Sequence, residues 1–296
     1  MLIRIAVGVT LALFFLAVLY FGGVVQCIAF SLATFLCAYE LINALKQKGI
    51  KPFSIPIYIF SISYYAVFKY IGMYWMLLLF ICCVTAIICE RIFSKSRNTA
   101  DALAGLVMFI YPLAFFVFIA ATDSLDYNII ARINALEQDN VFYVQTVMNA
   151  RISRVALLSM FACPLVGDTC AYFIGMLFGK KKLCPEISPK KTIAGSIGGA
   201  IGGVLGGLGV YYAQLLWDVH EGLIPLLLLG LLCGLLGQIG DLFASSIKRY
   251  AGIKDFGSIF PGHGGMLDRV DSVLICAPMV FMFFYKLNSV ISGVFF

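Results

Sequence analysis

Long apolar runs, separated by short polar stretches, set the pattern of this chain. About 20 apolar residues in helical form cross the hydrocarbon core of a bilayer. Within that core, backbone polar groups must pair inside a helix or a closed barrel, and runs of this length favour helices. The pattern therefore predicts an all-α polytopic membrane protein with about nine transmembrane helices, at residues 3–21, 23–44, 55–71, 73–90, 102–122, 153–178, 193–214, 222–243 and 272–291.

The composition supports an integral membrane protein. Of the 296 residues, 62% are hydrophobic and 12% are charged, and the mean hydropathy is +0.99. A soluble domain carries about 25% charged residues. The first run follows Arg4 and has no small-residue cleavage site, so we expect a retained helix and not a signal peptide.

The lysines and arginines predict the orientation, because they gather after every second apolar run. Such stretches stay in the cytoplasm under the positive-inside rule. The N-terminus is then cytoplasmic and the C-terminus lies outside. The cations concerned are Lys46, Lys48, Lys51, Arg91, Lys95, Arg97, Lys180, Lys181, Lys182, Lys190, Lys191, Lys248, Arg249, Lys254 and Arg269.

Residues 123–152 depart from this pattern and predict a division of the chain. Here Arg132 and Arg151 mix with Asp123, Asp126, Glu137 and Asp139, so the stretch is too polar to span. We expect a polar extramembrane loop on the outside, carrying at most a surface helix. It would separate N-terminal transmembrane helices (1–122) from a C-terminal region of helices and cytoplasmic loops (153–296) that holds the chemistry.

The run at 193–214 carries glycines at a four-residue period. They stand at 195, 199, 203 and 207, and again at 198, 202 and 206. A four-residue period lines small residues along a helical face, where another backbone can approach closely. This run also lacks the Lys-Ser/Thr of a phosphate-binding P-loop. Helix packing is therefore the better interpretation.

Carboxylates, cations and glycines concentrate at 240–271. On a helix, Asp241, Ser245 and Lys248 share a face with Arg249 beside it, and Asp268 and Asp271 share another face. Carboxylate oxygens suit Mg²⁺, whereas two histidines and the lack of a Cys-x-x-Cys argue against zinc. Three aspartates at helix ends thus predict a metal site.

The segment FPGHGG at 260–265 predicts an anion-binding loop. Its glycines, among them Gly264 beside His263, permit positive φ and let backbone N–H groups approach an anion. Lys248, Arg249 and Lys254 add charge that binds phosphate. Metal, cations and loop together indicate phosphoryl or nucleotidyl transfer.

A second polar cluster precedes it at 167–195. Asp168 is costly in hydrocarbon, so we expect it to line the same cavity. SPKKT at 188–192 predicts a turn in which Ser188 or Thr192 caps the next helix while Lys190 and Lys191 meet phosphate. The alternative for both clusters is a solvated cytoplasmic loop whose charges only set topology.

Residues 240–271 resemble the signature of the phosphatidate cytidylyltransferases, or CDP-diacylglycerol synthases. Asp-Thr-x-Ala-Tyr at 168–172, Phe-Gly-Lys at 178–180 and Ser-Pro-Lys-Lys-Thr at 188–192 also resemble family elements. Ala194 stands where the family usually has Glu, and Pro164 stands near the usual Trp. The matching signature positions are Gly240, Asp241, Ser245, Lys248, Arg249, Lys254, Asp255, Pro261, Gly262, His263, Gly264, Gly265, Asp268, Arg269 and Asp271.

The resemblance implies a bacterial inner-membrane enzyme, often a homodimer, with a funnel facing the cytoplasm. It would join CTP and phosphatidic acid among membrane lipids, need Mg²⁺ or a pair of cations, and bind no nucleic acid. Asp241, Asp268 and Asp271 would hold the metal and, with Lys248, form the catalytic set. Substrate would meet Asp168, Ser188, Lys190, Lys191, Thr192, Ser245, Arg249, Lys254, His263, Gly264 and Arg269.

Two other functions remain open at this point. The first is another membrane phospho- or nucleotidyltransferase of lipid metabolism. A CDP-alcohol phosphotransferase would also need metal, but its Asp-Gly-x-x-Ala-Arg motif does not occur here. A secondary transporter would explain Asp168 and the glycine-rich run. It would not explain carboxylates and phosphate-binding cations at one rim of the membrane.

The orientation gives a first testable prediction. Cysteines introduced as Glu186→Cys and Ser258→Cys in a cysteine-depleted background should resist a membrane-impermeant maleimide applied to intact cells, because their loops are cytoplasmic. Both should label after the cells are opened. Ready labelling of either position in intact cells would reverse the orientation.

Overall fold

The structure is a computed structural model that describes residues 2–93, 99–108, 111, 113, 115–123 and 141–291. Side chains are described within these ranges except at 2–5, 123, 141–151 and 286–291. The chain forms two compact units, the first made of Met1–Ala120 and Ser246–Val270, the second of Ala121–Ser245 and Asp271–Phe296. Each unit is discontinuous in sequence because the chain passes from one unit to the other three times, each time within a helix.

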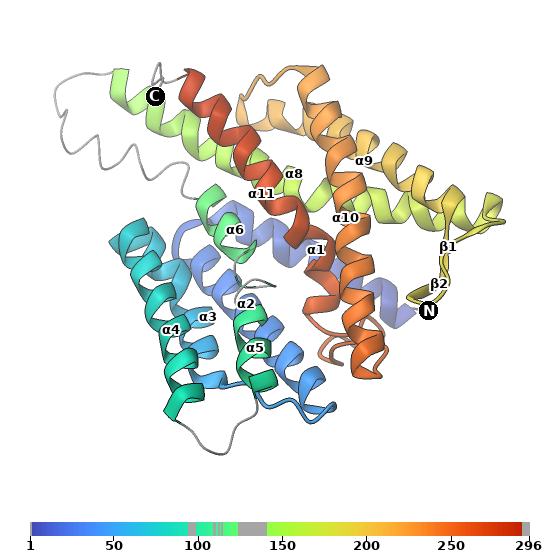
Figure 1. Cartoon of the computed structure of the whole chain (residues 1–296). Coiled ribbons are helices and arrows are strands. Elements are labelled where there is room, and N and C mark those ends of the chain that lie inside the picture. Colours follow the sequence, from blue (N-terminus) through green and yellow to red (C-terminus); the bar gives the residue numbers. More distant parts are fainter. Residues whose placement is uncertain are drawn as a thin grey trace. The chain divides into compact units, whose positions relative to one another are not determined.

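The first unit consists of the N-terminal helices together with the later segment Ser246–Val270. Its core includes Phe60, Tyr64 and Tyr65, all buried. α2 and α3 pack against each other, as do α3 and α4 (Figure 1). A π-helical turn at Val67–Ile71 follows α3. The helices of this unit are α1 (Leu2–Phe21), α2 (Gly23–Lys46), α3 (Ser54–Ala66), α4 (Met73–Phe93), α5 (Thr99–Met108) and most of α6 (Phe115–Asp123).

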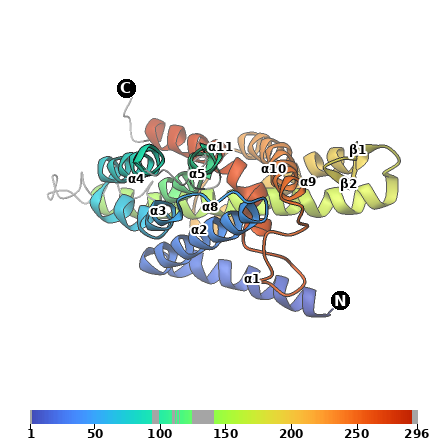
Figure 2. The same cartoon turned by 60° about the horizontal axis from the view of Figure 1, so that its bottom comes forward.

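Helix α9 (Ile193–Ala213) organises the second unit through its glycines. It lies beside α8 (Val141–Phe178), as both cartoon views show (Figures 1 and 2). A Cβ built at Gly202 would lie 2.6 Å from Cys170 Cβ on α8, and one at Gly203 would lie 2.8 Å from Gly234 Cα on α10 (Leu223–Ala251). The two glycine rows thus serve two neighbouring helices, which confirms the predicted helix packing.

A small β-hairpin joins α8 to α9 and departs from the all-α expectation. Strands β1 (Lys182–Cys184) and β2 (Ser188–Thr192) pair antiparallel, with Cys184 opposite Ser188. Thr192 then caps α9, its Oγ1 accepting the Gly195 N–H at 3.1 Å. The predicted cap is confirmed at Thr192, while Ser188 lies in the hairpin.

Several helix bounds differ from the sequence expectation. α8 begins at Val141, inside the stretch predicted as a polar loop, and α10 and α11 (Leu267–Ile291) extend beyond their predicted apolar runs. The charged residues Lys95, Arg97, Asp126, Arg132, Glu137 and Asp139 lie outside the described residues, and the side chains of Asp123 and Arg151 are not described.

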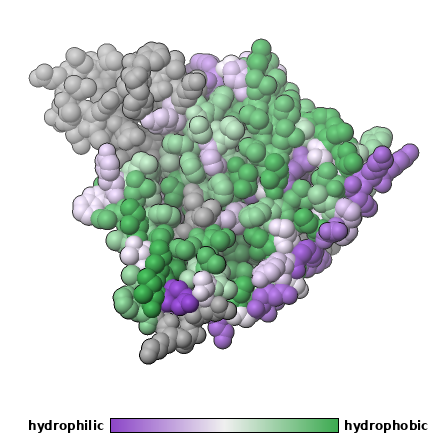
Figure 3. All heavy atoms as spheres, in the orientation of Figure 1, coloured by the Kyte–Doolittle hydropathy of each residue, from purple (hydrophilic) through white to green (hydrophobic). Residues whose placement is uncertain are grey.

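Five described helices are long and apolar enough to cross a membrane: Gly23–Lys46, Met73–Phe93, Ile152–Phe178, Ile193–Trp217 and Leu223–Ala251. Ala6–Phe21 and Thr99–Met108 are shorter apolar helices. Apolar side chains, green in Figure 3, cover much of the visible described surface. The protein is therefore helical and membrane-integral, while the count of nine spans and the orientation stay predictions.

The glycine packing gives a second prediction. Gly203→Val should destabilise the protein by about 1–3 kcal/mol, because its side chain would overlap Gly230 O and Gly234. Gly209→Val is the matched control on the same helix, since a Cβ there meets nothing within 4 Å. Thermal unfolding in detergent measures both. Equal loss in the two variants would show that α9 does not need its glycines for close packing.

Candidate functional site

In the second unit, α8, α10 and α11 come together beside the predicted carboxylates Asp241 and Asp271. A Cβ at Gly237 would lie 3.2 Å from Pro164 Cβ on α8 and 3.4 Å from Ser272 Cβ on α11. One turn later on α10, a Cβ at Gly240 would overlap the Asp271 carbonyl oxygen. Asp241 follows directly. The glycines of α10 thus let the α11 backbone approach beside Asp241.

Asp168 and Asp271 both accept hydrogen bonds from Ser272. Asp168 lies one turn after Pro164 on α8, and its Oδ2 accepts a hydrogen bond from Ser272 Oγ at 3.2 Å. Asp271 precedes Ser272 and is buried, and its Oδ1 accepts the Ser272 N–H at 2.8 Å. Side chains from two helices far apart in sequence are therefore linked at the level of Asp241.

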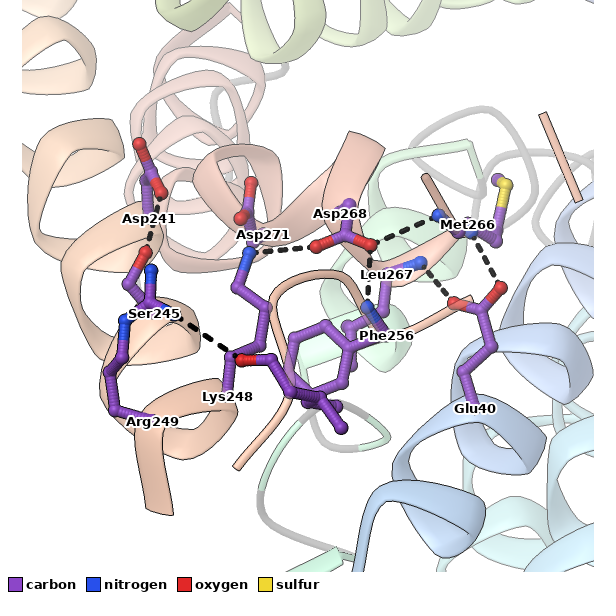
Figure 4. Close-up of polar contacts among 12 residues, drawn as sticks. Glu40, Asp241, Ser245, Lys248, Arg249, Phe256, Met266, Leu267, Asp268 and Asp271 are labelled. Carbon is purple, nitrogen blue, oxygen red and sulfur yellow. Dashed lines mark hydrogen bonds and ion pairs between the residues drawn. The ribbon is translucent and has the colours of Figure 1, made fainter. Parts of the chain in front are cut away.

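Asp241 is paired with a lysine from the hairpin. Lys191 Nζ lies 2.7 Å from Asp241 Oδ2, with side-chain exposures of 24% and 31%. Ser245 Oγ donates to Asp241 Oδ1 at 3.2 Å (Figure 4). Neighbouring residues of a strand point to opposite faces. Lys190 accordingly is exposed while Lys191 is half-buried, so the two lysines occupy different environments.

In the first unit, the loop between α10 and α11 is a tight turn set by glycines. Gly262 and Gly264 have φ of 76° and 81°, which confirms the predicted positive φ. The His263 N–H donates to Phe260 O at 2.8 Å, and the Phe260 N–H donates to Gly264 O at 3.0 Å. His263 and Gly264 are thereby held in one compact turn.

Asp268, in the first turn of α11, holds this loop through three hydrogen bonds. Its Oδ1 accepts from Lys248 Nζ at 2.7 Å, and its Oδ2 accepts the N–H groups of Phe256 at 2.8 Å and Gly265 at 3.0 Å (Figure 4). The Lys248 ammonium also lies 5.4 Å from the Phe256 ring centroid. Both side chains are nearly buried, at 10% exposure for Lys248 and 4% for Asp268. These are charge-assisted contacts shielded from solvent, the stronger kind.

The remaining predicted cations of the loop lie on the surface. Arg249, Lys254 and Arg269 are exposed. Arg249 Nη1 approaches Ile253 O at 3.4 Å. Exposed, long cationic side chains can meet an anion that arrives from solvent, and this fits the predicted phosphate-binding role.

The chemistry of the predicted metal ligands fits Mg²⁺, and the three residues belong to both units: Asp268 to the first, Asp241 and Asp271 to the second. Carboxylate oxygens are the ligands that Mg²⁺ prefers. Within the described residues, no three His, Cys, Asp or Glu side chains stand close enough together to hold an ion. Instead, Lys191 lies against Asp241 and Lys248 against Asp268. The lysines supply the positive charge that these carboxylates need.

One polar residue of the first unit was missed by the sequence interpretation. Glu40 lies in α2, within the apolar run 23–44, and contacts the start of α11. A signal was present, because an ionisable residue inside an apolar run marks a functional candidate. Nothing local indicated its partner, which lies more than 220 positions away.

The chain resembles known proteins over most of its length. The sequence model of the cytidylyltransferase family matches residues 2–287. A phosphatidate cytidylyltransferase of Synechocystis sp. is 42% identical over 134 residues, which are 45% of this chain and 44% of that protein. Those of Staphylococcus epidermidis (41% over 124 residues, 42% and 46%) and Bacillus subtilis (42% over 123 residues, 41% and 45%) are similar. The aligned part thus spans less than half of each relative.

The lysine environments give a third prediction. If CTP is the nucleotide, as the sequence leads us to expect, Lys190→Ala and Lys191→Ala should each weaken its binding by at least about tenfold through the loss of charge-assisted phosphate contacts. Lys191→Ala should also lower the unfolding temperature, because Asp241 loses its partner. Titration of CTP by calorimetry measures the binding.

The control for these variants is Lys182→Ala, which removes an exposed lysine from β1 and should keep CTP affinity within about twofold. Wild-type CTP affinity in both hairpin variants would leave Lys190 and Lys191 as topology signals alone.

Proposed function

Because the chain belongs to the cytidylyltransferase family, we propose that it joins CTP to phosphatidate, giving CDP-diacylglycerol and pyrophosphate. The observation that carries the proposal is the packing of α8, α10 and α11 at Gly237 and Gly240. That packing brings Asp168, Asp241 and Asp271 into one region of the second unit, where Lys191 of β2 pairs with Asp241. Lipid-linked nucleotidyl transfer needs this combination of membrane and phosphate chemistry, whereas a transporter does not.

The proposed step is a displacement at the α-phosphorus of CTP. An oxygen of the phosphatidate phosphate forms the new bond to phosphorus, and the bond to the bridging oxygen of pyrophosphate breaks. The electron pair leaves with pyrophosphate. A phosphate monoester is already ionised near neutral pH, so no strong general base is required. What the protein must supply is orientation and positive charge.

Asp241, Asp268 and Asp271 are the proposed ligands of Mg²⁺ or of a pair of cations. Their oxygen chemistry supports this role, as does the spacing of Asp268 and Asp271 one turn apart at the start of α11. When bound, the metal would neutralise charge on the phosphates and the departing pyrophosphate. Release of Lys191 from Asp241 to a substrate phosphate would let the same lysine serve both states.

The other polar residues are proposed to orient substrate. Lys248, kept in place by Asp268, completes the proposed catalytic set. Ser245 donates a hydrogen bond to Asp241, and Asp168 accepts one from Ser272, the neighbour of Asp271. These contacts would keep the proposed metal ligands in place. Phosphate groups would meet the hairpin and the loop, through Ser188, Lys190, Lys191, Thr192, Arg249, Lys254, His263, Gly264 and Arg269.

The proposed setting is the inner membrane of a bacterium, with the active site facing the cytoplasm. The relatives named above are bacterial, and the cations gather in alternate loops. CTP is a cytoplasmic, multiply charged substrate, so a site on that face needs no nucleotide transport. From the resemblance of the signature segments, the protein is also proposed to form a homodimer and to bind no nucleic acid.

The metal proposal gives the fourth prediction. Purified protein given CTP labelled in the cytidine, phosphatidate and Mg²⁺ should form labelled lipid, and EDTA should abolish this until Mg²⁺ is restored. Asp241→Asn, Asp268→Asn and Asp271→Asn should each lower turnover by about 100-fold or more, the scale of a lost electrostatic contact to the transition state.

The control is Asp218→Asn, because that carboxylate is exposed and pairs with the exposed His220 at 3.3 Å, away from the proposed metal ligands in the sequence. Its turnover should stay near wild type. Full activity in EDTA, or near-normal turnover in all three site variants, would remove the metal from this proposal.

A further inference from the structure

Glu40 is a buried carboxylate that the proposed reaction does not use. Its residue is 2% exposed, near the C-terminal end of α2. Burying an ionisable group in an apolar helix is costly unless the protein supplies hydrogen bonds. The contacts of Glu40 therefore indicate what its retention achieves.

Both carboxylate oxygens of Glu40 hold the start of α11. Oε1 accepts the Met266 N–H at 2.9 Å, and Oε2 accepts the Leu267 N–H at 2.9 Å (Figure 4). The first N–H groups of a helix have no partner within the helix, and a negative charge there is favourable. Glu40 thus caps α11 from a distant helix of the same unit.

Two glycines of the loop make room for this carboxylate. The three atoms nearest to a Cβ built at Gly257, and likewise at Gly265, all belong to Glu40, and the closest would overlap. Neither glycine is among the described residues with positive φ. Close approach to Glu40, and not backbone conformation, is therefore what these two positions require.

The cap leaves Asp268 free for other partners. Asp268 lies in the first turn of α11, directly after the two amides that Glu40 engages. An unengaged N–H at a helix start attracts a nearby side-chain oxygen. Because Met266 and Leu267 are occupied, Asp268 instead meets Lys248, Phe256 and Gly265. The two carboxylates divide the amides of this loop between them.

We propose that Glu40 is a positioning residue for nucleotidyl transfer, which sets the direction of Asp268 and the shape of the loop 252–266. The inference rests on the proposed function, in which Asp268 is a metal ligand. Glu40 touches neither substrate nor metal and acts through Asp268. It gives the N-terminal helices a part in the reaction that the signature segments alone do not show.

The decisive variant is Glu40→Gln, which keeps the shape but replaces one acceptor oxygen by an NH₂ group that faces an N–H. The Mg²⁺ concentration for half-maximal turnover should rise by about tenfold or more, as when a group that orients a metal ligand is lost. The maximal rate should also fall. Amides of 256 and 265–267 should exchange with D₂O at least about tenfold faster.

Two comparisons separate positioning from a general loss of stability. Thr34 lies on α2, as Glu40 does, and Thr34→Val removes its buried hydrogen bond to Tyr64 of α3. This variant should therefore lower stability while leaving the Mg²⁺ dependence unchanged. Gly257→Ala should imitate Glu40→Gln by displacing the carboxylate. In a Glu40→Ala background Gly257→Ala should add little, because both changes act through one contact.

The outcomes distinguish this inference from the proposed function. Wild-type turnover together with an unchanged Mg²⁺ dependence in Glu40→Gln would overturn the inference alone. So would a shift of equal size in Thr34→Val, or unchanged exchange at 265–267. A wild-type protein that forms no CDP-diacylglycerol would overturn the proposed function, and the exchange comparison would still decide whether Glu40 holds this loop.

Discussion

An ionised side chain in an apolar chain must find its counterpart inside the protein, and this constraint shapes the described polar regions. Lys191 lies against Asp241, Lys248 against Asp268, and the Met266 and Leu267 amides against Glu40. Each pair joins segments that are distant in sequence. Satisfying these charges therefore fixes the hairpin on α10 in one unit, and the loop on α2 in the other. The proposed metal and phosphate sites use these same paired side chains, so binding there would exchange one partner for another.

Close packing at small residues is also needed to form these ion pairs and hydrogen bonds, because the polar side chains meet only where the helix backbones approach closely. The glycine rows of α9 bring it against α8 on one side and α10 on the other. Gly237 and Gly240 then admit Ser272 and the Asp271 backbone beside Asp241. In hydrocarbon, where helix association gains little from the hydrophobic effect, such packing is a main source of helix affinity. Packing that stabilises the second unit thus also assembles its carboxylates.

Local features were predictable from the sequence, and contacts between distant residues were not. The apolar runs, the glycine period, the Thr192 cap and the positive φ at Gly262 and Gly264 each follow from a few adjacent residues. The hairpin at 182–192 was missed because its strands are very short. The early start of α8 was missed because charged residues flank its first turns in the sequence, at 123–139 and at Arg151. The Glu40 contact depends on tertiary packing across more than 220 positions, which no local period encodes. The metal site stays a prediction, since it was inferred from residue chemistry.

The fate of the individual phosphates of CTP tests the central claim of nucleotidyl transfer most directly. Purified protein would be incubated with phosphatidate, Mg²⁺ and CTP labelled with ³²P at either the α- or the γ-position, followed by lipid extraction. Attack at the α-phosphorus predicts that α-label enters the lipid phase and that γ-label appears, in equal amount, as aqueous pyrophosphate. Label from the γ-position in the lipid would show phosphoryl transfer instead. That result, or no lipid label from either form, would contradict the account.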